Sequence, residues 1–464
     1  MWHLPFLWLS VLFFLCGPTW AGPEIRILDT PNRLIFSGFS SALSALGDVN
    51  GDAIPDYVVG AYEQTWDENN HQGRAFVFDG QTGKLLLELD NPHPQADAAF
   101  GFSVAAAGDV NQDGIPDCII GAFGQGEAGS AETLVFGWTA EDGNEYNVSK
   151  RAGSGQVFVF SGHDGQLLHS LEAPQQSAGA GFGWSVASAG DLTGDGIPES
   201  IVGAHGQDHE GRAFVFQGHD GTLLHTLAPP PDSGAEGFGW TVNSAGDLNR
   251  DGTPDIVIGA PYSTVEGRST QGRVYVYSGV DGSLLYPIDH PQPQAGASFG
   301  WHVTPAGDLN EDSVPDLLIG APYQDVGAVT AQGVAFAFSG TDGTLLLTFR
   351  DPVPRSAAGF GWIMSAIPDV NMDEVPEILV SAPFQKVDEF HVQGEVFLYN
   401  GRDGRHLITF DNPYPHQGSM FGYALASPGD INADDIPEFV FGAPGQHIRD
   451  KPAVGRAFLF VSQR

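Results

Sequence analysis

The side chains best suited to chemistry are acidic and amide residues that recur in seven short loops of the chain. In each loop they stand at the first, third, fifth and ninth positions, directly before an apolar run. Ca²⁺ takes about six to eight oxygen ligands, and alternate loop positions can turn inward while the carbonyl group at the seventh position adds another oxygen. Mg²⁺ keeps its waters and rarely uses sites built wholly from protein. The spacing therefore predicts calcium sites.

The predicted ligands keep one register in all seven copies. They are Asp48, Asn50, Asp52 and Asp56; Asp109, Asn111, Asp113 and Asp117; Asp191, Thr193, Asp195 and Glu199; Asp247, Asn249, Asp251 and Asp255; Asp308, Asn310, Asp312 and Asp316; Asp369, Asn371, Asp373 and Glu377; and Asp430, Asn432, Asp434 and Glu438. Three acidic residues in each of seven loops make 21 of the 57 acidic residues in the chain. Carboxylates crowded into one turn repel one another unless a cation lies between them.

The alternative interpretation is that these loops are solvated turns, which Asp and Asn favour without any metal. Seven copies in one register favour the metal interpretation for the set. Three of the loops have Gly at the sixth position, where a sharp turn needs a positive φ. We expect the loops that begin at Asp109 and Asp247 to form the best sites. The loops of Asp369 and Asp430, which have a longer Glu at the ninth position, should form the poorest.

Internal repetition organises the chain. The phrase that first appears as GDVNGDAIPDYVVGA occurs seven times, with start-to-start spacings of 61, 82, 56, 61, 61 and 61 residues. A Phe-Gly pair stands eight residues before six of the copies, and Phe39-Ser40 takes its place before the first. The six pairs begin at Phe100, Phe182, Phe238, Phe299, Phe360 and Phe421. Regular spacing of this kind indicates one structural unit that is repeated through the fold.

Each repeat has the pattern of four short strands. In the second repeat these are residues 102–107, 117–121, 156–161 and 166–171. Alternating residues and an Asp-Gly turn before the last strand indicate antiparallel pairing. No stretch after the N-terminal segment has a helical period. Four-stranded units at this spacing predict an all-β fold, a seven-bladed β-propeller of antiparallel blades.

The two ends of the chain predict how the ring closes. The seventh repeat ends with its third strand, at residues 456–461, so its fourth strand is missing. Residues 24–29 precede the first repeat with the spacing of a fourth strand. We expect this N-terminal strand to complete the last blade, with Ile27 close to Leu459 and the register open by a residue or two. Such pairing leaves no unpaired inner edge.

The spacing of 82 residues marks an insertion of about 21 residues in the second repeat, within residues 124–150. The insertion contains Asn147-Val148-Ser149, an acceptor pattern for N-glycosylation in a secreted eukaryotic protein. The alternative is an unmodified surface loop, because a three-residue pattern often arises by chance. Asn147 is therefore the candidate glycosylation residue.

The N-terminal segment has the features of a targeting signal. An apolar run over residues 4–15 is followed by Gly17, Pro18 and the small residue Ala21. This pattern predicts a secretory signal peptide at residues 1–21, with lipid attachment at Cys16 as the alternative. We expect residues 22–464 to form the propeller of a secreted protein, or of a periplasmic or cell-surface protein if the source is bacterial. Cys118 would then be its only thiol, and no disulfide within the chain could stabilise it.

The charge balance limits the partners. The 464 residues include 57 acidic and 19 basic side chains, for a formal net charge of −38. Nucleic acids and anionic membrane surfaces would be repelled by such a protein. No later run approaches the ~20 apolar residues of a membrane span. We therefore expect no nucleic-acid partner, no membrane span, and a monomer or weak oligomer.

Two sets of aromatic residues recur near the ends of the predicted strands. One set follows the Gly-Ala phrase and comprises Tyr62, Phe123, His205, Tyr262, Tyr323 and Phe384. The other follows the Phe-Gly pair and comprises Phe102, Trp184, Trp240, Trp301, Trp362 and Tyr423. In a ring these sets would lie concentrically near the central opening, on the face opposite the acidic loops. The five Tyr and Phe residues of the first set are candidates for binding a partner, unless the rings only pack blade against blade.

Taken together, these motifs resemble a known family. The Phe-Gly pair, the Asp-x-Asn-x-Asp-x-x-x-Asp loop and the Gly-Ala-Pro ending are similar to the FG-GAP repeats of integrin α-chain head domains and of related secreted propellers. The resemblance covers essentially the whole chain after residue 21. It implies a seven-bladed propeller that holds Ca²⁺ in the loops between the first and second strands and binds protein partners on the opposite face.

Three functions are compatible with the sequence. The first is a secreted, calcium-stabilised module that binds an extracellular protein, for example in cell adhesion. The second is a carbohydrate-binding propeller whose aromatic sets stack on sugars. The third is a glycan hydrolase or lyase with its site in the central opening. The chain has no nucleophile motif, no His-x-x-x-His pair and no phosphate-binding loop, so we expect a binding protein rather than an enzyme.

Overall fold

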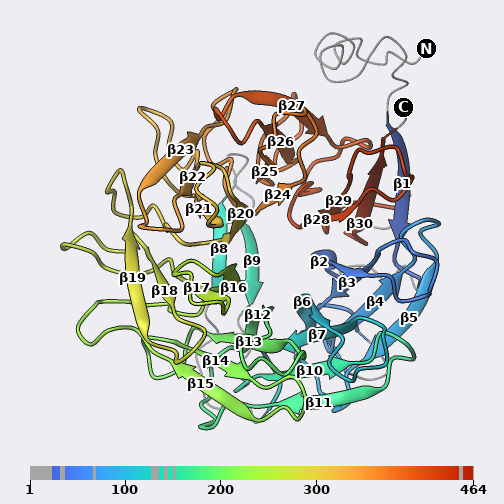
Figure 1. The fold of residues 1–464 in the computed structure, drawn as a ribbon. Coiled ribbons are helices and arrows are strands. Elements are labelled where there is room, and N and C mark those ends of the chain that lie inside the picture. The colour runs from blue at the N-terminus through green and yellow to red at the C-terminus, as the bar shows by residue number, and fades with distance from the viewer. Residues whose placement is uncertain are drawn as a thin grey trace.

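The protein is a ring of β-sheets around a central opening (Figure 1). The computed structural model describes residues 23–31, 37–65, 69–126, 135–139, 145–149, 153–448 and 453–462. Seven sheets of four strands make up the ring, neighbouring strands are antiparallel, and no helix occurs among the described residues. The seven-bladed, all-β propeller predicted from the repeats is therefore confirmed.

Each blade runs from an inner strand at the opening to an outer strand at the rim. The first three blades are β2 (Phe39–Gly47), β3 (Asp56–Ala61), β4 (Arg74–Phe78) and β5 (Leu85–Asp90); β6 (Phe100–Gly108), β7 (Asp117–Ala122), β10 (Gln156–Phe160) and β11 (Leu167–Leu171); and β12 (Phe182–Gly190), β13 (Glu199–Ala204), β14 (Arg212–Phe216) and β15 (Leu223–Leu227). The next three are β16 (Thr241–Gly246), β17 (Asp255–Ala260), β18 (Arg273–Tyr277) and β19 (Leu284–Asp289); β20 (Val303–Gly307), β21 (Asp316–Ala321), β22 (Val334–Phe338) and β23 (Leu345–Phe349); and β24 (Met364–Ile367), β25 (Glu377–Ala382), β26 (Glu395–Tyr399) and β27 (His406–Asp411). The seventh blade is β28 (Leu425–Gly429), β29 (Glu438–Ala443), β30 (Arg456–Val461) and β1 (Glu24–Asp29).

The second strand of each blade lies in the core. Every residue of β3, β7, β13, β17, β21, β25 and β29 is buried. Both faces of these strands pack against neighbouring blades, which explains their continuous apolar sequence. The outer strands, such as β5, combine exposed and buried positions because they form the rim.

The Phe-Gly pair joins each blade to the one before it. The Phe is 0% exposed in all seven repeats, Phe39 included. Phe100 bridges to Gly73 of the preceding blade, and a Cβ atom at Gly73 would lie 2.0 Å from the Phe100 carbonyl oxygen. Gly73 also has a φ of +83°, so the close approach and the backbone conformation both require glycine. A Gly in the same place meets the Phe carbonyl at all seven blade boundaries, which explains why the pair recurs.

Strands from the two ends of the chain close the ring in the seventh blade. Figure 1 shows β1, in blue, beside β30, in red, and the two strands pair antiparallel. Ile27 stands opposite Phe458, one residue from the expected neighbour Leu459. Asp29 accepts a hydrogen bond from Arg456 Nε at 2.7 Å. We call this β1–β30 pairing the clasp, and it confirms the predicted completion of the last blade by the N-terminal strand.

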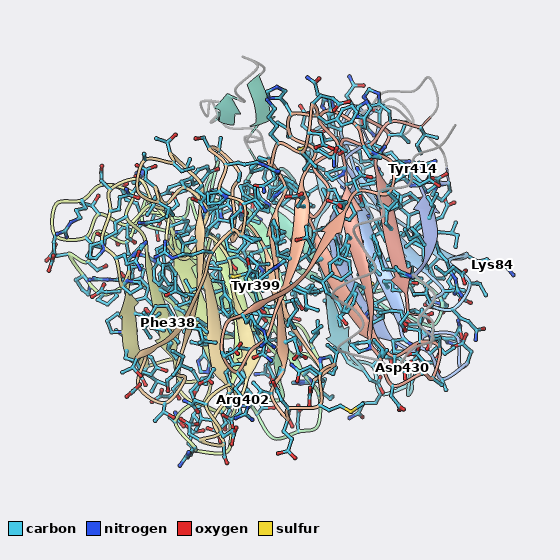
Figure 2. The ribbon with its side chains drawn as sticks, turned by 90° about the horizontal axis from the view of Figure 1, so that it is seen from above. Lys84, Phe338, Tyr399, Arg402, Tyr414 and Asp430 are labelled. Carbon is cyan, nitrogen blue, oxygen red and sulfur yellow. The ribbon has the colours of Figure 1, made fainter. Side chains whose placement is uncertain are left out.

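The insertion in the second repeat contains a hairpin. Its strands are β8 (Val135–Thr139) and β9 (Glu145–Ser149), with Gly137 opposite Asn147. The hairpin overlaps the central opening in the view along the ring (Figure 1) and stands beyond the face opposite Asp430 in the side view (Figure 2). The candidate glycosylation residue Asn147 thus belongs to a strand, where the sequence suggested an irregular loop.

The predicted signal peptide, residues 1–21, lies outside the described residues. Across the described ranges, no helix has the length and apolar character that a membrane crossing requires. Cys118 is buried and carries a free thiol.

The sixth blade lacks an ion pair that three other blades share. In those blades an Arg at the start of the third strand pairs with an Asp at the end of the fourth: Arg74 with Asp90 at 2.5 Å, Arg273 with Asp289 at 2.6 Å and Arg456 with Asp29 at 2.7 Å. The sixth blade has Glu395 opposite Asp411 at these positions. Burial raises the pKa of Glu395 to about 7 and also raises the pKa of Asp411. Two carboxyl groups therefore face each other where three other blades place opposite charges.

Replacing Glu395 with Gln is expected to raise the melting temperature by ~2 °C at neutral pH. Gln156 fills this position in the second blade and donates to Glu172 at 2.8 Å, so an amide fits there. The pKa of Glu395 is higher in the folded state than the ordinary 4.5, so ionisation disfavours folding above about pH 7. That penalty disappears as the pH falls towards 4.5, and the gain from E395Q should shrink with it in thermal melts.

The charged groups around Glu395 show which result would contradict this prediction. Arg355 lies 3.3 Å from Glu395 and lowers its pKa, whereas Asp351 and Asp411 raise it. If E395Q instead lowers the melting temperature above about pH 7 and leaves it unchanged near pH 4.5, the ion pair with Arg355 outweighs the burial of the carboxyl group.

Candidate metal centres and the aromatic belt

The acidic loops lie on one face of the ring, each between the first and second strands of a blade. Figure 2 shows Asp430 at this face, with Arg402 from another turn of the same side. In all seven loops the fourth residue has a φ between +59° and +81° and the sixth between +66° and +93°. The sixth residue is Gly114, Gly196, Gly252, Ala53, Ser313, Glu374 or Asp435. All seven loops share these two left-handed positions, even where the residue is not glycine and the conformation carries strain.

The first aspartate organises each loop by accepting backbone N–H groups. Asp48 Oδ1 accepts from Gly51 at 2.7 Å and from Asp52 at 3.1 Å, and Oδ2 accepts from Ala53 at 2.7 Å. Asp109, Asp191, Asp247, Asp308, Asp369 and Asp430 bind their own loops in the same way. Burial alone would raise the pKa of Asp48, but these hydrogen bonds hold it below the usual value.

The third and fifth positions continue this inward arrangement. Asn50 Oδ1 accepts from the Asp52 amide at 3.0 Å, and Asp52 Oδ1 accepts from Ile54 at 2.9 Å. The same asparagine contact occurs at Asn111, Asn249, Asn310 and Asn432. The Asn371 side chain donates to Glu377, as Asn432 does to Glu438, and Thr193 replaces the asparagine in the third loop. Oxygen atoms from successive alternate positions thus turn into each loop.

The ninth residue is a buried carboxylate in every loop. Asp56, Asp117, Glu199, Asp255, Asp316, Glu377 and Glu438 are all 0% exposed. Asp56 accepts from Val49 N at 2.9 Å and from Gly80 N at 2.8 Å, so it ties the loop to the turn between the third and fourth strands. Burial raises the pKa of each Asp in this set to about 6 and that of Glu377 to about 7, with neighbouring carboxylates adding to the shift. A cation beside these groups would stabilise their ionised form.

Three carboxylates approach one another most closely in the last two loops. Asp369, Asp373 and Glu377 offer oxygens that all lie within 4.8 Å of one another, as do Asp430, Asp434 and Glu438. We expected these two loops to be the poorest. Among the described residues the other five loops, including that of Glu199, form no such cluster. The expected order of the sites and the role of all seven loops as metal sites stay predictions.

The two aromatic sets form one continuous structure on the opposite face, which we call the aromatic belt. Its members are Tyr62, Phe102, Phe123, Trp184, His205, Trp240, Tyr262, Trp301, Tyr323, Trp362, Phe384 and Tyr423. The four Trp rings follow one another at centroid distances of 4.6 to 4.7 Å and interplanar angles of 43° to 50°. The Gly-Ala set packs edge-on against them, as in the Trp240–Tyr262 contact at 79°. The sets expected to be concentric are therefore interleaved.

Burial separates the candidate partner-binding residues into two groups. Phe123 is 1% exposed and Phe384 is 5% exposed, because neighbouring rings cover them. Tyr62, Tyr262 and Tyr323 are half-buried, although the Tyr262 hydroxyl group itself is buried. Partner binding by these five residues stays a prediction, and the three tyrosines have the larger accessible area.

One polar residue of the central opening escaped the sequence analysis. His302 follows the aromatic residue of the fifth repeat, at a position occupied by small, hydroxyl or aliphatic residues in the other repeats. The motifs shared by the repeats do not reveal His302, because this position differs from repeat to repeat. A comparison of the variable positions would have found it.

Comparison with known proteins gives a family and several relatives. Residues 238–277 and 299–335 match the model of the FG-GAP repeat. The chain is 28% identical over 232 residues to integrin alpha-7 of Mus musculus, which covers 47% of this chain and 19% of the relative. It is 30% identical over 223 residues to integrin alpha-5 of Xenopus laevis, a match that covers 45% of this chain and 20% of the relative. It is 29% identical over 290 residues to phosphatidylinositol-glycan-specific phospholipase D of Bos taurus, a match that covers 57% of this chain and 34% of the relative. The chain therefore spans a fifth to a third of the length of these relatives. The repeats, the fold and the relatives together show that this chain contains FG-GAP repeats and resembles the integrin α-chain propeller.

Proposed function

We propose that this protein is a secreted, calcium-binding propeller that binds an extracellular protein through the face bearing the aromatic belt. The observation that carries the calcium part is the fully buried ninth carboxylate, which recurs in seven loops of one backbone conformation. A buried carboxylate beside further carboxylates is costly unless a cation or a proton neutralises it. The donor set consists of oxygens alone, as a hard cation requires.

In each loop the first, third, fifth and ninth side chains would hold the ion, together with the carbonyl group of the seventh residue. The ion would neutralise the loop and link the two connections of a blade, since the ninth residue also contacts the turn between the third and fourth strands. Seven occupied loops would add 14 positive charges and change the net charge from −38 to −24. The size and flexibility of these loops favour Ca²⁺ over Mg²⁺.

The partner part of the proposal rests on surface chemistry and on the relatives. The belt face carries half-buried tyrosines and two exposed large side chains, Tyr414 and Val353, which are 48% and 54% exposed. Tyrosine is enriched at protein interfaces because it combines apolar area with a polar tip. The integrin α-chains among the relatives suggest a role in adhesion, and the predicted signal peptide suggests secretion. The phospholipase D relatives are named for an enzyme activity, but this chain spans 34% of the bovine protein, and we propose binding.

A pair of matched variants tests the partner face. Val353 follows the fourth strand of the fifth blade on the belt face, and Val280 lies in a turn on the calcium face with nearly the same exposure, 55%. Proteins captured from extracellular fluid by the calcium-loaded protein would be identified, purified and measured by surface plasmon resonance. V353R combined with Y414A should weaken binding at least tenfold, whereas V280R should leave it unchanged.

Two results would contradict this proposal. Equal loss of binding in V353R and V280R would place the contact elsewhere or show that charge alone matters. Strong binding on a glycan array that is lost in V353R combined with Y414A would replace the protein partner of this face with a carbohydrate.

A further inference from the structure

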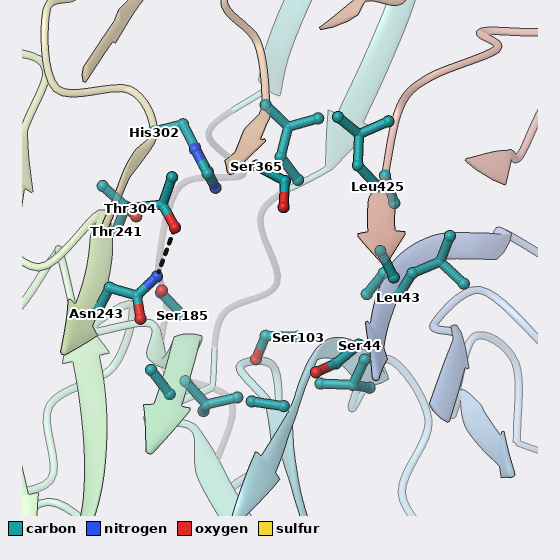
Figure 3. A pocket seen from close by; sticks show the side chains of 18 of the residues that line it. Leu43, Ser44, Ser103, Ser185, Thr241, Asn243, His302, Thr304, Ser365 and Leu425 are labelled. Carbon is teal, nitrogen blue, oxygen red and sulfur yellow. Dashed lines mark hydrogen bonds between the residues drawn. The ribbon is translucent and has the colours of Figure 1, made fainter. Parts of the chain in front are cut away.

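The inner strands of the blades enclose a cavity of about 550 Å³ (Figure 3). β2, β6, β12, β16, β20, β24 and β28 form its wall, and rings of the aromatic belt border it at one end. Cavities of about 300–1,000 Å³ are typical of small-molecule sites. The size is therefore suited to a ligand as well as to water.

The wall of this cavity is uncharged, although the chain carries 57 acidic and 19 basic side chains. Nine Ser and Thr hydroxyl groups and the amide of Asn243 line it. A wall without charge offers no counter-ion to a charged ligand, and a wholly apolar ligand would leave these polar groups unpaired at a cost. The lining suits a neutral ligand that is rich in hydrogen-bonding groups.

The polar and apolar residues lie on different sides of the cavity. His302, Thr304 and Asn243 lie on one side and point towards the opening in Figure 3, with Asn243 Nδ2 donating to Thr304 Oγ1 at 3.4 Å. Leu43 and Leu425 lie on the other side. A sugar ring has the same division, with hydroxyl groups along its edge and C–H groups on its face. The cavity thus matches both parts of a pyranose.

His302 differs from the residues at the same place in neighbouring blades. Ser103 Oγ donates to the Gly183 carbonyl at 2.8 Å, and Ser185 Oγ accepts from Val242 N at 3.1 Å, so these residues join blades. The Nδ1 atom of His302 is buried and has no hydrogen-bond partner among the described residues. Burial also lowers the pKa of His302 to about 4, so the ring is neutral at physiological pH and has one donor and one acceptor. The His302 ring points into the opening in Figure 3, so its outer edge is the part that can reach a ligand.

We propose that the central cavity binds a neutral, polyhydroxylated molecule, a sugar residue, whose hydroxyl groups bond to His302, Thr304 and Asn243 while its C–H face packs on Leu43 and Leu425. The ligand is either a free monosaccharide or the terminal residue of a glycan. This site does not depend on the proposed protein-binding face, because it lies inside the ring.

The test uses saturation-transfer NMR on the calcium-loaded full chain. The probes are free neutral monosaccharides, their methyl glycosides and short neutral oligosaccharides, with a charged sugar phosphate as a negative probe. Transfer to at least one neutral sugar is expected, with none to the phosphate. Transfer to glycosides but not to the free sugar would identify the ligand as a terminal glycan residue. Transfer to both would show that a free monosaccharide is sufficient for binding.

Variants of the wall complete the test. H302L should reduce the transfer at least fivefold, H302N should restore part of it, and I363V, at the same place in the next blade, should leave it unchanged. T304V is a second isosteric variant for the case in which H302L does not fold. The proposal is overturned if no neutral sugar shows transfer, if H302L and T304V bind as well as the native protein, or if a neutral peptide competes in place of the sugars.

Discussion

Chelation of divalent cations is expected to lower the melting temperature of the purified protein by on the order of 10 °C, and excess Ca²⁺ should restore it. The reason is the ninth carboxylate of each loop, which is 0% exposed and lies near other carboxylates. Ca²⁺ bound to the folded loops stabilises the folded state by mass action. Mg²⁺ should restore little, because it gives up its waters reluctantly and demands octahedral geometry. Differential scanning calorimetry of the same sample in EGTA, Ca²⁺ and Mg²⁺ measures all three states.

The pH dependence in chelator gives a second check with a definite sign. The buried Asp residues have a pKa of about 6 in the folded protein and 3.8 ordinarily, so the folded state binds protons more tightly than the unfolded state. The penalty for ionising them is present above about pH 6 and disappears as the pH falls towards 3.8. In chelator, the melting temperature should therefore rise on acidification from about pH 7.5 to about pH 5. Bound Ca²⁺ already neutralises these groups, so this rise should be smaller in its presence.

Two matched substitutions distinguish metal binding from general charge effects. Asp251 stands at the fifth position of a loop and Asp281 in the neighbouring turn of the same blade, and each is exposed and accepts a backbone N–H at 2.9 Å. D251N should lower the melting temperature in Ca²⁺ and leave it unchanged in chelator. D281N should change the melting temperature by the same amount in Ca²⁺ and in chelator. An unchanged melt of the native protein in chelator would rule out the metal interpretation.

Deletion of residues 22–30, which removes the clasp strand, is expected to lower the melting temperature by on the order of 10 °C or to cause aggregation. The deletion removes a strand paired over six residues with β30, and each ladder hydrogen bond contributes about 1 kcal/mol net. Leu28, which is 1% exposed, contributes ~2 kcal/mol by burial, and the Asp29–Arg456 ion pair is also lost. The open edge of β30 would then be free to pair with another chain.

The inserted hairpin provides the control deletion. The backbone of Gly153 packs directly against the carbonyl groups of Gly124 and Gln125, so the two ends of the insertion are close enough for a short Gly-Ser linker. Replacing residues 127–152 removes almost three times as many residues as the clasp deletion but should change the melting temperature by only ~2 °C. A larger effect from the hairpin than from the clasp would contradict the closure argument. A cysteine pair at positions 27 and 458, which stand opposite each other, should also cross-link the clasp.

Features repeated in every copy could be predicted from the sequence. The Phe-Gly pairs, the loop register and the missing strand led to seven blades and to the clasp, because each blade must contact its neighbours in the same way. The register was left open by a residue or two, because strand spacing does not determine which residues pair, and the structure places Ile27 opposite Phe458. The spacing also did not predict that the carboxylates of Glu377 and Glu438 would lie close to those of the first and fifth residues of their loops.

Features that depend on tertiary contacts could not be predicted. Phe123 and Tyr262 occupy equivalent positions, yet Phe123 is 1% exposed whereas Tyr262 keeps part of its surface exposed. Ala53 and Ser313 adopt a left-handed conformation that their residue types disfavour, since the loop hydrogen bonds outweigh the local preference. The significance of His302 emerged only when the inner strands had been arranged around one cavity.

The clasp also sets the order of events during synthesis. A ribosome makes β1 first and its partner β30 last, and the paired residues Asp29 and Arg456 are 427 positions apart. Until β30 emerges, β1 has no strand to join, and Ser40 of the first repeat lacks the Arg456 carbonyl to which it donates at 2.6 Å. The entropic cost of closing so long a loop grows only slowly with its length. The separation of the two strands therefore delays the closure of the ring more than it destabilises the closed ring. The nascent chain must therefore keep β1 from pairing wrongly while the other blades are translated, and the ring becomes whole only after β30 has been made.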